Sequence, residues 1–315
     1  MWLFLAALLG LYFLRRWYRE RQTVENLTEK YVFITGCDSG FGNLLARQLD
    51  LKGMRVLAGC LTQKGAEELE KATSDRLKTT ILDVTRTEGV AAAAEWVKGC
   101  VGDKGLWGLV NNAGIGGLVG PNAFMIKDDF AKVINVNLLG LIDVTLQMLP
   151  LVKRARGRVV NVGSILGRLA LTGGGYCPSK FGVEAFSDSL RLELHAFEVQ
   201  VIVIEPGMFK TAIVDVEPLL KNRWGQVPPD VKESYGEQFV KRYCKLINTS
   251  FQKYGNDNLS PVTNCIEHAL KSCYPRFRYS AGWDAKYFHI PASYLPSCVV
   301  DFGLGCILPK PSHAM

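Results

Sequence analysis

Short runs of β-branched and apolar residues alternate along the chain with longer amphipathic stretches, and this alternation predicts strands joined by helices. Six runs are strand candidates: residues 31–35, 55–60, 77–82, 106–111, 158–162 and 199–205. Nearly continuous apolar strands need cover on both faces, and parallel strands need long crossovers that supply it. The pattern therefore predicts an α/β fold, a doubly wound Rossmann-type parallel sheet in a single domain.

Two longer helical patterns accompany the strands. Residues 128–154 carry an apolar side at helical spacing and predict a long central helix. After Gly207 the alternation lapses, and Pro228 and Pro229 begin a second amphipathic stretch. Its apolar positions predict one helix, which in this fold would cover the substrate: Val231, Tyr235, Phe239, Tyr243 and Leu246.

The N-terminus has the pattern of an uncleaved membrane anchor. The apolar run 2–14 is shorter than the roughly 20 residues of a straight spanning helix, but Trp17 and Tyr18 extend it as interfacial aromatics. The basic cluster of residues 15–21 follows the apolar run, which favours the cytosolic face. Three glycosylation sequons favour the lumen instead, and they begin at Asn26, Asn248 and Asn258.

The C-terminal stretch 287–308 is also apolar, but Pro291, Pro296 and Asp301 interrupt it, so a regular spanning helix is not expected. Contact with the membrane, packing over the core and a subunit contact in a homo-oligomer all remain open. The expected division is 1–27 anchor and linker, 28–210 dinucleotide-binding catalytic core, 211–286 substrate-covering segment and last strand, and 287–315 apolar tail.

Composition narrows the class of partner. The 315 residues carry a net charge of +7, yet Lys and Arg are scattered and form no basic stripe, which argues against nucleic acid. The nine cysteines form no Cys-x-x-Cys pair, and no His stands at metal-ligand spacing. The sequence thus predicts no disulfide framework and no metal site.

A glycine-rich turn, residues 35–42, directly follows the first predicted strand and precedes a helix. Glycines there let the backbone approach a pyrophosphate, whose charge meets the helix N-terminus. Asp38 in the turn would repel the 2′-phosphate of NADP, whereas Lys64, beyond the second strand, would attract it. We expect NAD as the cofactor, with NADP as the alternative.

Ser164 follows the fifth strand, and Tyr176 and Lys180 stand four residues apart at the start of a helix, on one face. A phenol is a poor base at neutral pH, and a nearby ammonium would lower its pKa. Tyr176 would then take the hydroxyl proton of an alcohol while Ser164 binds the substrate oxygen, so that a hydride leaves for a nicotinamide.

Together these motifs resemble the short-chain dehydrogenase/reductase family over residues 28–280. The matching features, in order, are the turn 35–42, the run 111–114, Ser164, the segment 176–180 and the pair Pro206-Gly207. The closest resemblance is to the microsomal retinol and 3α/17β-hydroxysteroid dehydrogenase branch, through residues 33–42, 173–177 and 279–286. One departure is Gly163, where many members have a second serine.

The resemblance implies further roles. Asn137 would be a fourth catalytic residue that holds a water of the proton relay, and Lys180 would also bind the nicotinamide ribose. Asn112 would hold neighbouring strands together. The implied cofactor-binding set is Gly36, Asp38, Ser39, Gly40, Phe41, Gly42, Lys64, Asp83, Asn111, Ala113, Gly114, Tyr176, Lys180, Pro206, Gly207, Phe209 and Thr211.

The sequence thus predicts an oxidoreductase of the endoplasmic reticulum membrane that reversibly oxidises a lipophilic alcohol, a retinoid or a steroid. Two alternatives remain: an NADPH-dependent carbonyl reductase, and a non-catalytic nucleotide-binding scaffold, which would have no reason to keep all four catalytic residues. Candidates for the apolar substrate pocket are Leu166, Leu169, Leu171, Met208, Trp224 and Phe239.

Overall fold

Seven parallel strands form one sheet in the order β3-β2-β1-β4-β5-β6-β7 in a computed structural model that describes residues 2–211 and 216–312. The strands are β1 Tyr31–Thr35, β2 Arg55–Cys60, β3 Lys78–Ile81, β4 Gly108–Asn111, β5 Arg158–Val162, β6 Gln200–Pro206 and β7 Arg278–Ala281. All six candidate strands are present, with ends that differ from the prediction by at most two residues. β7 is the expected last strand, and the doubly wound fold is confirmed.

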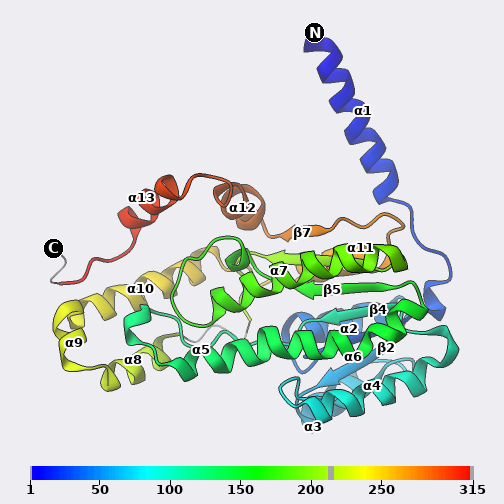
Figure 1. Ribbon diagram of the computed structural model, residues 1–315, viewed down its shortest axis with the longest axis horizontal. Coiled ribbons are helices and arrows are strands. Elements are labelled where there is room, and N and C mark those ends of the chain that lie inside the picture. The colour runs from blue at the N-terminus through cyan, green and yellow to red at the C-terminus, as the bar shows by residue number, and fades with distance from the viewer. Residues whose placement is uncertain (1, 212–215, 313–315) are drawn as a thin grey trace.

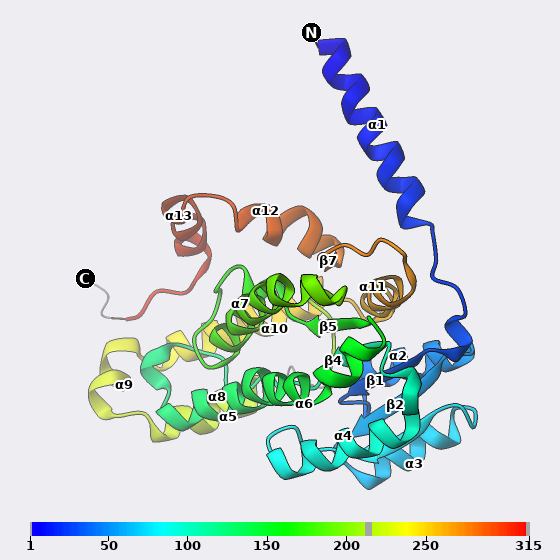
Figure 2. The ribbon, with the colours of Figure 1, turned by 45° about the vertical axis from the view of Figure 1, so that its right-hand side comes forward.

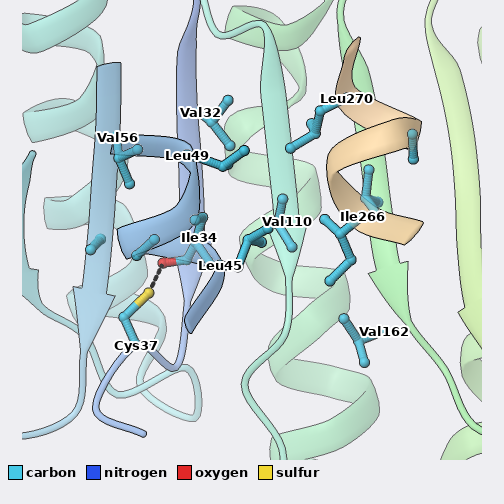
Figure 3. Close-up of a cluster of buried hydrophobic side chains, with 14 of the residues drawn as sticks. Val32, Ile34, Cys37, Leu45, Leu49, Val56, Val110, Val162, Ile266 and Leu270 are labelled. Atoms are coloured by element: carbon cyan, nitrogen blue, oxygen red, sulfur yellow. Dashed lines mark hydrogen bonds between the residues drawn. The ribbon is translucent and has the colours of Figure 1, made fainter. Parts of the chain in front are cut away.

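Helices cover both faces of the sheet (Figures 1 and 2). The helices on one face are α2 Gly40–Leu51, α3 Gln63–Lys71 and α11 Ser260–Lys271. Those on the other face are α4 Thr87–Val101, α6 Leu141–Arg154 and α7 Tyr176–Leu194. Figure 3 shows Leu45 and Leu49 of α2 and Ile266 of α11 against Val32 and Val110 of the sheet. Burial of such aliphatic side chains stabilises the two cores and fixes the strand ends that carry the site.

The predicted helix 128–154 is continuous but not regular. It comprises α5 Lys127–Ile134, a π-helical segment η4 Asn135–Gly140, and α6. Residues 127–154 are long and apolar enough to cross a membrane, but Val144, Met148 and Val152 are fully buried against the sheet. This is therefore a core helix, and its wider π turn lies where Asn137 enters the site.

The segment after β6 forms a small helical cover, and the prediction of a single helix after Pro228 is wrong. Two helices, α9 Pro229–Tyr235 and α10 Glu237–Tyr254, are separated by Gly236, whose φ of +76° ends α9. With α8 Val216–Gln226 they enclose a third core, in which the rings of Tyr235 and Phe239 lie 5.0 Å apart. The predicted apolar positions do lie on helices, but the positive φ of Gly236 divides the predicted helix in two.

Helix α1, Trp2–Glu20, stands clear of the body (Figure 1). Its base is held by backbone hydrogen bonds from Val24 N–H to Lys271 O, 2.8 Å, and from Cys273 N–H to Gln22 O, 2.8 Å. At the other end, residues 285–292 and α13 Ser297–Ile307 meet at 119°, so the C-terminal stretch is not one straight helix. The remaining short helices are η1 Leu27–Glu29, η2 Gly102–Lys104, η3 Asn122–Phe124, η5 Ile165–Gly167, η6 His195–Phe197, η7 Ala285–His289 and α12 Ile290–Ala292.

Candidate active site

The site begins where the strand order reverses, between the carboxyl ends of β1 and β4. The Thr35 hydroxyl accepts hydrogen bonds from the backbone N–H groups of Asn112 and Ala113, both 3.0 Å. The side-chain amide of Asn112 donates to Thr35 O, 2.9 Å, and to Gly36 O, 3.0 Å. These bonds hold the turns after the two strands together, which is the role expected of Asn112.

The glycine-rich turn has the close packing that a dinucleotide site requires. Gly36 has a φ of +71°, and a Cβ there would lie 2.8 Å from Cα of Ala113. At Gly42, in the first turn of α2, a Cβ would collide with the carbonyl oxygen of Gly36. Ser39 is exposed and Gly40 begins α2, so the helix N-terminus opens onto the turn. The turn therefore fits a pyrophosphate at its backbone N–H groups.

Asp38 and Lys64, the two charges that bear on cofactor choice, lie in different surroundings. The Asp38 carboxylate accepts from the backbone N–H of Leu61, 2.7 Å, and from the N–H and hydroxyl of Thr62, 2.9 and 2.7 Å. It is therefore fixed beside the end of β2. The Lys64 side chain is 84% exposed, and its amine lies 3.8 Å from Glu68. The fixed charge near the adenosine position is thus negative.

Asp83 and Asn111, two members of the implied cofactor-binding set, differ in how their side chains are used. The Asp83 carboxylate accepts from the Thr85 hydroxyl, 2.7 Å, and N–H, 3.0 Å, and these bonds lower its pKa. The Asn111 amide points into the core instead and donates to Asn161 and Thr145, both 2.8 Å. The part of this run that can face a cofactor is therefore the backbone after Asn111, through Ala113 and Gly114.

The loop after β6, which carries Pro206, Gly207, Phe209 and Thr211, is packed against the glycine-rich turn. The ring of Phe209 meets the ring of Phe41 edge-on, with centroids 5.6 Å apart. A Cβ at Gly40 would lie 4.0 Å from the methyl group of Thr211. The structure thus brings together two segments of the implied cofactor-binding set, the glycine-rich turn and the loop after β6.

Tyr176 is the first residue of α7, and its phenol is partly buried. Burial raises the pKa of Tyr176 above its usual value, and a hydrogen bond with Ser164 opposes that rise. Ser164 is itself 6% exposed, and its hydroxyl accepts from Leu166 N–H at 3.1 Å. Ser164 therefore makes a contact that favours the phenolate, an effect that the sequence analysis had assigned to Lys180 alone.

Lys180 lies one helical turn after Tyr176 and is 5% exposed. Its amine lies 5.7 Å from the centre of the Tyr176 ring and donates to the carbonyl of Val162, 2.8 Å. Burial lowers the pKa of Lys180 to about 8, and Glu184 opposes this. Tyrosine, serine and lysine thus meet at the carboxyl end of β5, as the hypothesis requires.

Asn137 extends this group from the π-helical segment. Its amide nitrogen donates to Ile115 O, 2.9 Å, and to the Ser179 hydroxyl, 3.1 Å, while its oxygen accepts from Ile115 N–H, 2.8 Å. The Ser179 hydroxyl in turn donates to the backbone carbonyl of Tyr176, 2.7 Å. Asn137 therefore connects the loop after β4 to the first turn of α7.

The pocket candidates separate into two groups. Leu166, Leu169, Leu171 and Met208 are partly buried and belong to the segments that follow Ser164 and Gly207. Phe239 is 6% exposed inside the cover, where Phe124 lies between it and Trp224, with ring centroids at 6.3 and 5.2 Å. Phe239 and Trp224 thus stabilise the cover, which leaves the four aliphatic residues as the better candidates.

Two residues act at the site without having been predicted to do so. Asp284, 4% exposed, accepts from Met208 N–H at 2.7 Å and lies against Gly207. Ser179 links Asn137 to Tyr176, as described above. Asp284 stood in a run quoted for the resemblance, but its contact spans 76 residues and no local pattern reports it.

A family model described as short chain dehydrogenase matches residues 30–218. The chain belongs to this family. It is 61% identical to human retinol dehydrogenase 16 and 57% identical to bovine 17-beta-hydroxysteroid dehydrogenase type 6, and each alignment covers 100% of both chains. A short-chain dehydrogenase from Streptomyces avermitilis covers 88% of this chain and 95% of its own, with a TM-score of 0.69 at 24% identity.

Membership of this family confirms the predicted class of enzyme and the predicted fold. The chain is a short-chain, NAD(P)-dependent alcohol dehydrogenase of the branch that contains retinol and hydroxysteroid dehydrogenases. The fold is the one the family uses for a nicotinamide dinucleotide. The non-catalytic scaffold is therefore set aside.

Proposed function

We propose that this protein uses NAD to oxidise the hydroxyl group of a lipophilic alcohol, a retinol or a 3α/17β-hydroxysteroid. The observation that carries the proposal is the meeting of Tyr176, Ser164 and Lys180 at the carboxyl end of β5, on the same edge of the sheet as the glycine-rich turn after β1. The relatives named above act, by their names, on retinol and on 17β-hydroxysteroids, and they align over the whole chain.

In this mechanism the Ser164 hydroxyl donates to the substrate oxygen and Tyr176 accepts the alcohol proton. Lys180, held at Val162 O, places a positive charge 5.7 Å from the centre of the Tyr176 ring and stabilises the phenolate that accepts this proton. Asn137 and Ser179 hold the first turn of α7 in place. Gly207 and Thr211 would hold the nicotinamide, which would supply the hydride acceptor.

The choice of NAD over NADP rests on Asp38. A carboxylate offers about four acceptor sites, and the three protein donors leave one for a ribose hydroxyl. A 2′-phosphate would meet this negative charge, and the nearest candidate cation, Lys64, extends into solvent.

The catalytic core lies at the endoplasmic reticulum membrane, on its cytosolic face, with residues 1–27 as anchor and linker. The support is the exposure of apolar side chains on α1, such as Leu11 at 63% and Leu14 at 61%, and the basic residues that follow. In both ribbon views α12 and α13 lie on the same side of the body as α1 (Figures 1 and 2), and Phe302 of α13 is 77% exposed. A site at the bilayer surface meets retinoids and steroids where they concentrate.

The test is a substrate panel on the full-length protein in membranes. All-trans-retinol and androstanediol are each offered with NAD and with NADP, and reduced cofactor is measured. We expect turnover with NAD on at least one alcohol; turnover only with NADPH and a carbonyl would contradict the proposal. Protease protection in sealed microsomes tests the membrane side, and protection of the core would place it in the lumen instead.

A further inference from the structure

A cluster of charged side chains, two of them buried carboxylates, surrounds the helical turn that follows Lys180. Its centre is Glu184, one helical turn after Lys180 and 6% exposed. One carboxylate oxygen, Oε2, accepts from Nε and Nη2 of Arg278 on β7, 3.1 and 3.0 Å. The other charged groups around it are Asp188 on α7, Glu205 on β6 and Arg168 after η5.

The second oxygen of Glu184, Oε1, is buried and has no hydrogen-bond partner among the described residues. It lies 3.0 Å from the position that a Cβ would occupy at Gly163. Gly163 stands between Val162, whose carbonyl accepts from Lys180, and Ser164. The departure noted in the sequence, glycine where many family members have serine, thus coincides with the place where the carboxylate meets the catalytic segment.

An unpaired buried carboxylate oxygen is costly unless a positive charge lies nearby. Burial and the repulsion of Glu205 raise the pKa of Glu184 to about 7, while Arg278 and Arg168 lower it. The pKa of Lys180 is lowered to about 8 by burial and raised by Glu184.

We propose that Glu184 is a positioning residue for the reaction, whose carboxylate, seated against Gly163 one helical turn after Lys180, keeps the Lys180 amine charged where it donates to Val162. Arg278 fixes the carboxylate through Oε2 and leaves Oε1 facing the catalytic segment. The absence of a side chain at residue 163 is what allows this approach. The inference rests on the proposed function, in which the lysine must be an ammonium to stabilise the Tyr176 phenolate.

The test compares Glu184→Gln with Asp188→Asn in the full-length protein. Each change removes a different carboxylate that pairs with Arg278, but only Glu184 lies one helical turn from Lys180. Lys180 is titrated without turnover, by its rate of acylation from roughly pH 6 to 10, measured by peptide mass spectrometry. The pH dependence of kcat is measured on the same variants.

We expect Glu184→Gln to lower the titration midpoint of Lys180, and with it the alkaline limb of kcat, by about one pH unit. Asp188→Asn should leave the Lys180 midpoint and the alkaline limb of kcat unchanged. Gly163→Ala places a Cβ against Oε1 of Glu184. It should therefore shift the Lys180 midpoint and the alkaline limb of kcat in the same direction as Glu184→Gln.

An unchanged midpoint in Glu184→Gln would overturn the inference, and so would an equal shift in Asp188→Asn, since that would assign the effect to Arg278. The acylation measurement separates this inference from the proposed function. A wild-type protein that oxidises no alcohol would refute the function, while the Lys180 midpoint would still decide the role of Glu184.

Discussion

The carboxylate of Asp284 accepts a hydrogen bond from the backbone N–H of Met208 at 2.7 Å, and so ties the segment after β7 to the loop after β6. Asp284 is buried, and its backbone carbonyl is bonded to Nδ1 of His289, 3.1 Å. The loop that it holds also carries Phe209, which packs on Phe41 of the glycine-rich turn. The geometry of the loop after β6 therefore depends on a residue distant in sequence.

Replacing Asp284 by Ala should loosen this loop. Met208 N–H would lose its partner, and an unsatisfied buried donor costs about 1–3 kcal/mol. We expect a lower melting temperature and a raised KM for the cofactor, measured by thermal unfolding and by steady-state kinetics. Asp284→Asn keeps an acceptor oxygen and serves as the control; equal KM values in all three proteins would show that the loop does not need this bond.

Much of the fold could be predicted from local pattern because each strand is a compact apolar run with clear ends. The same local signals located Gly36, Ser164, Tyr176 and Lys180, since each follows a strand or begins a helix. The break between α9 and α10 was missed because apolar spacing continues across Gly236, and only its positive φ reveals the turn.

Side-chain direction was harder to predict than position. Asn111 was correctly placed at the end of β4, yet its amide enters the core rather than the cofactor site. Lys64 follows β2 as expected, but its side chain extends into solvent along α3. Both outcomes depend on which neighbours fill the space around the side chain, and those neighbours are far away in sequence.

Tyr176→Phe should reduce kcat by about 100- to 10 000-fold, because it removes the only proton acceptor placed at the substrate hydroxyl by the proposed mechanism. Cofactor affinity, measured by quenching of protein fluorescence, should stay within about threefold of the wild-type value, since the ring and helix remain. Retention of most activity would assign the proton transfer to another group.

Asn137→Ala tests whether the π-helical segment positions the catalytic helix. The change removes both bonds to the Ile115 backbone and the bond to Ser179. We expect kcat to fall by about 100-fold and thermal stability to drop, because Ile115 N–H loses its partner. Ser179→Ala removes the bonds of its hydroxyl to Asn137 and to the Tyr176 carbonyl but keeps both bonds between Asn137 and Ile115, so it should give a smaller loss of kcat. A larger loss in Ser179→Ala would show that Asn137 acts elsewhere.

Cofactor choice can be tested with one charge and a matched control. Asp38→Asn keeps the shape of the side chain and one acceptor oxygen, which can serve the N–H and hydroxyl of Thr62. It loses the acceptor for Leu61 N–H and removes the negative charge that would face a 2′-phosphate. A unit charge about 4 Å away is worth about 1–4 kcal/mol between water and a protein surface. We therefore expect the ratio of kcat/KM for NADP to that for NAD to rise about tenfold or more. Lys64→Ala should leave the ratio unchanged, because this amine is exposed and directed toward Glu68; a fall in NADP use in that variant would show that Lys64 reaches the phosphate.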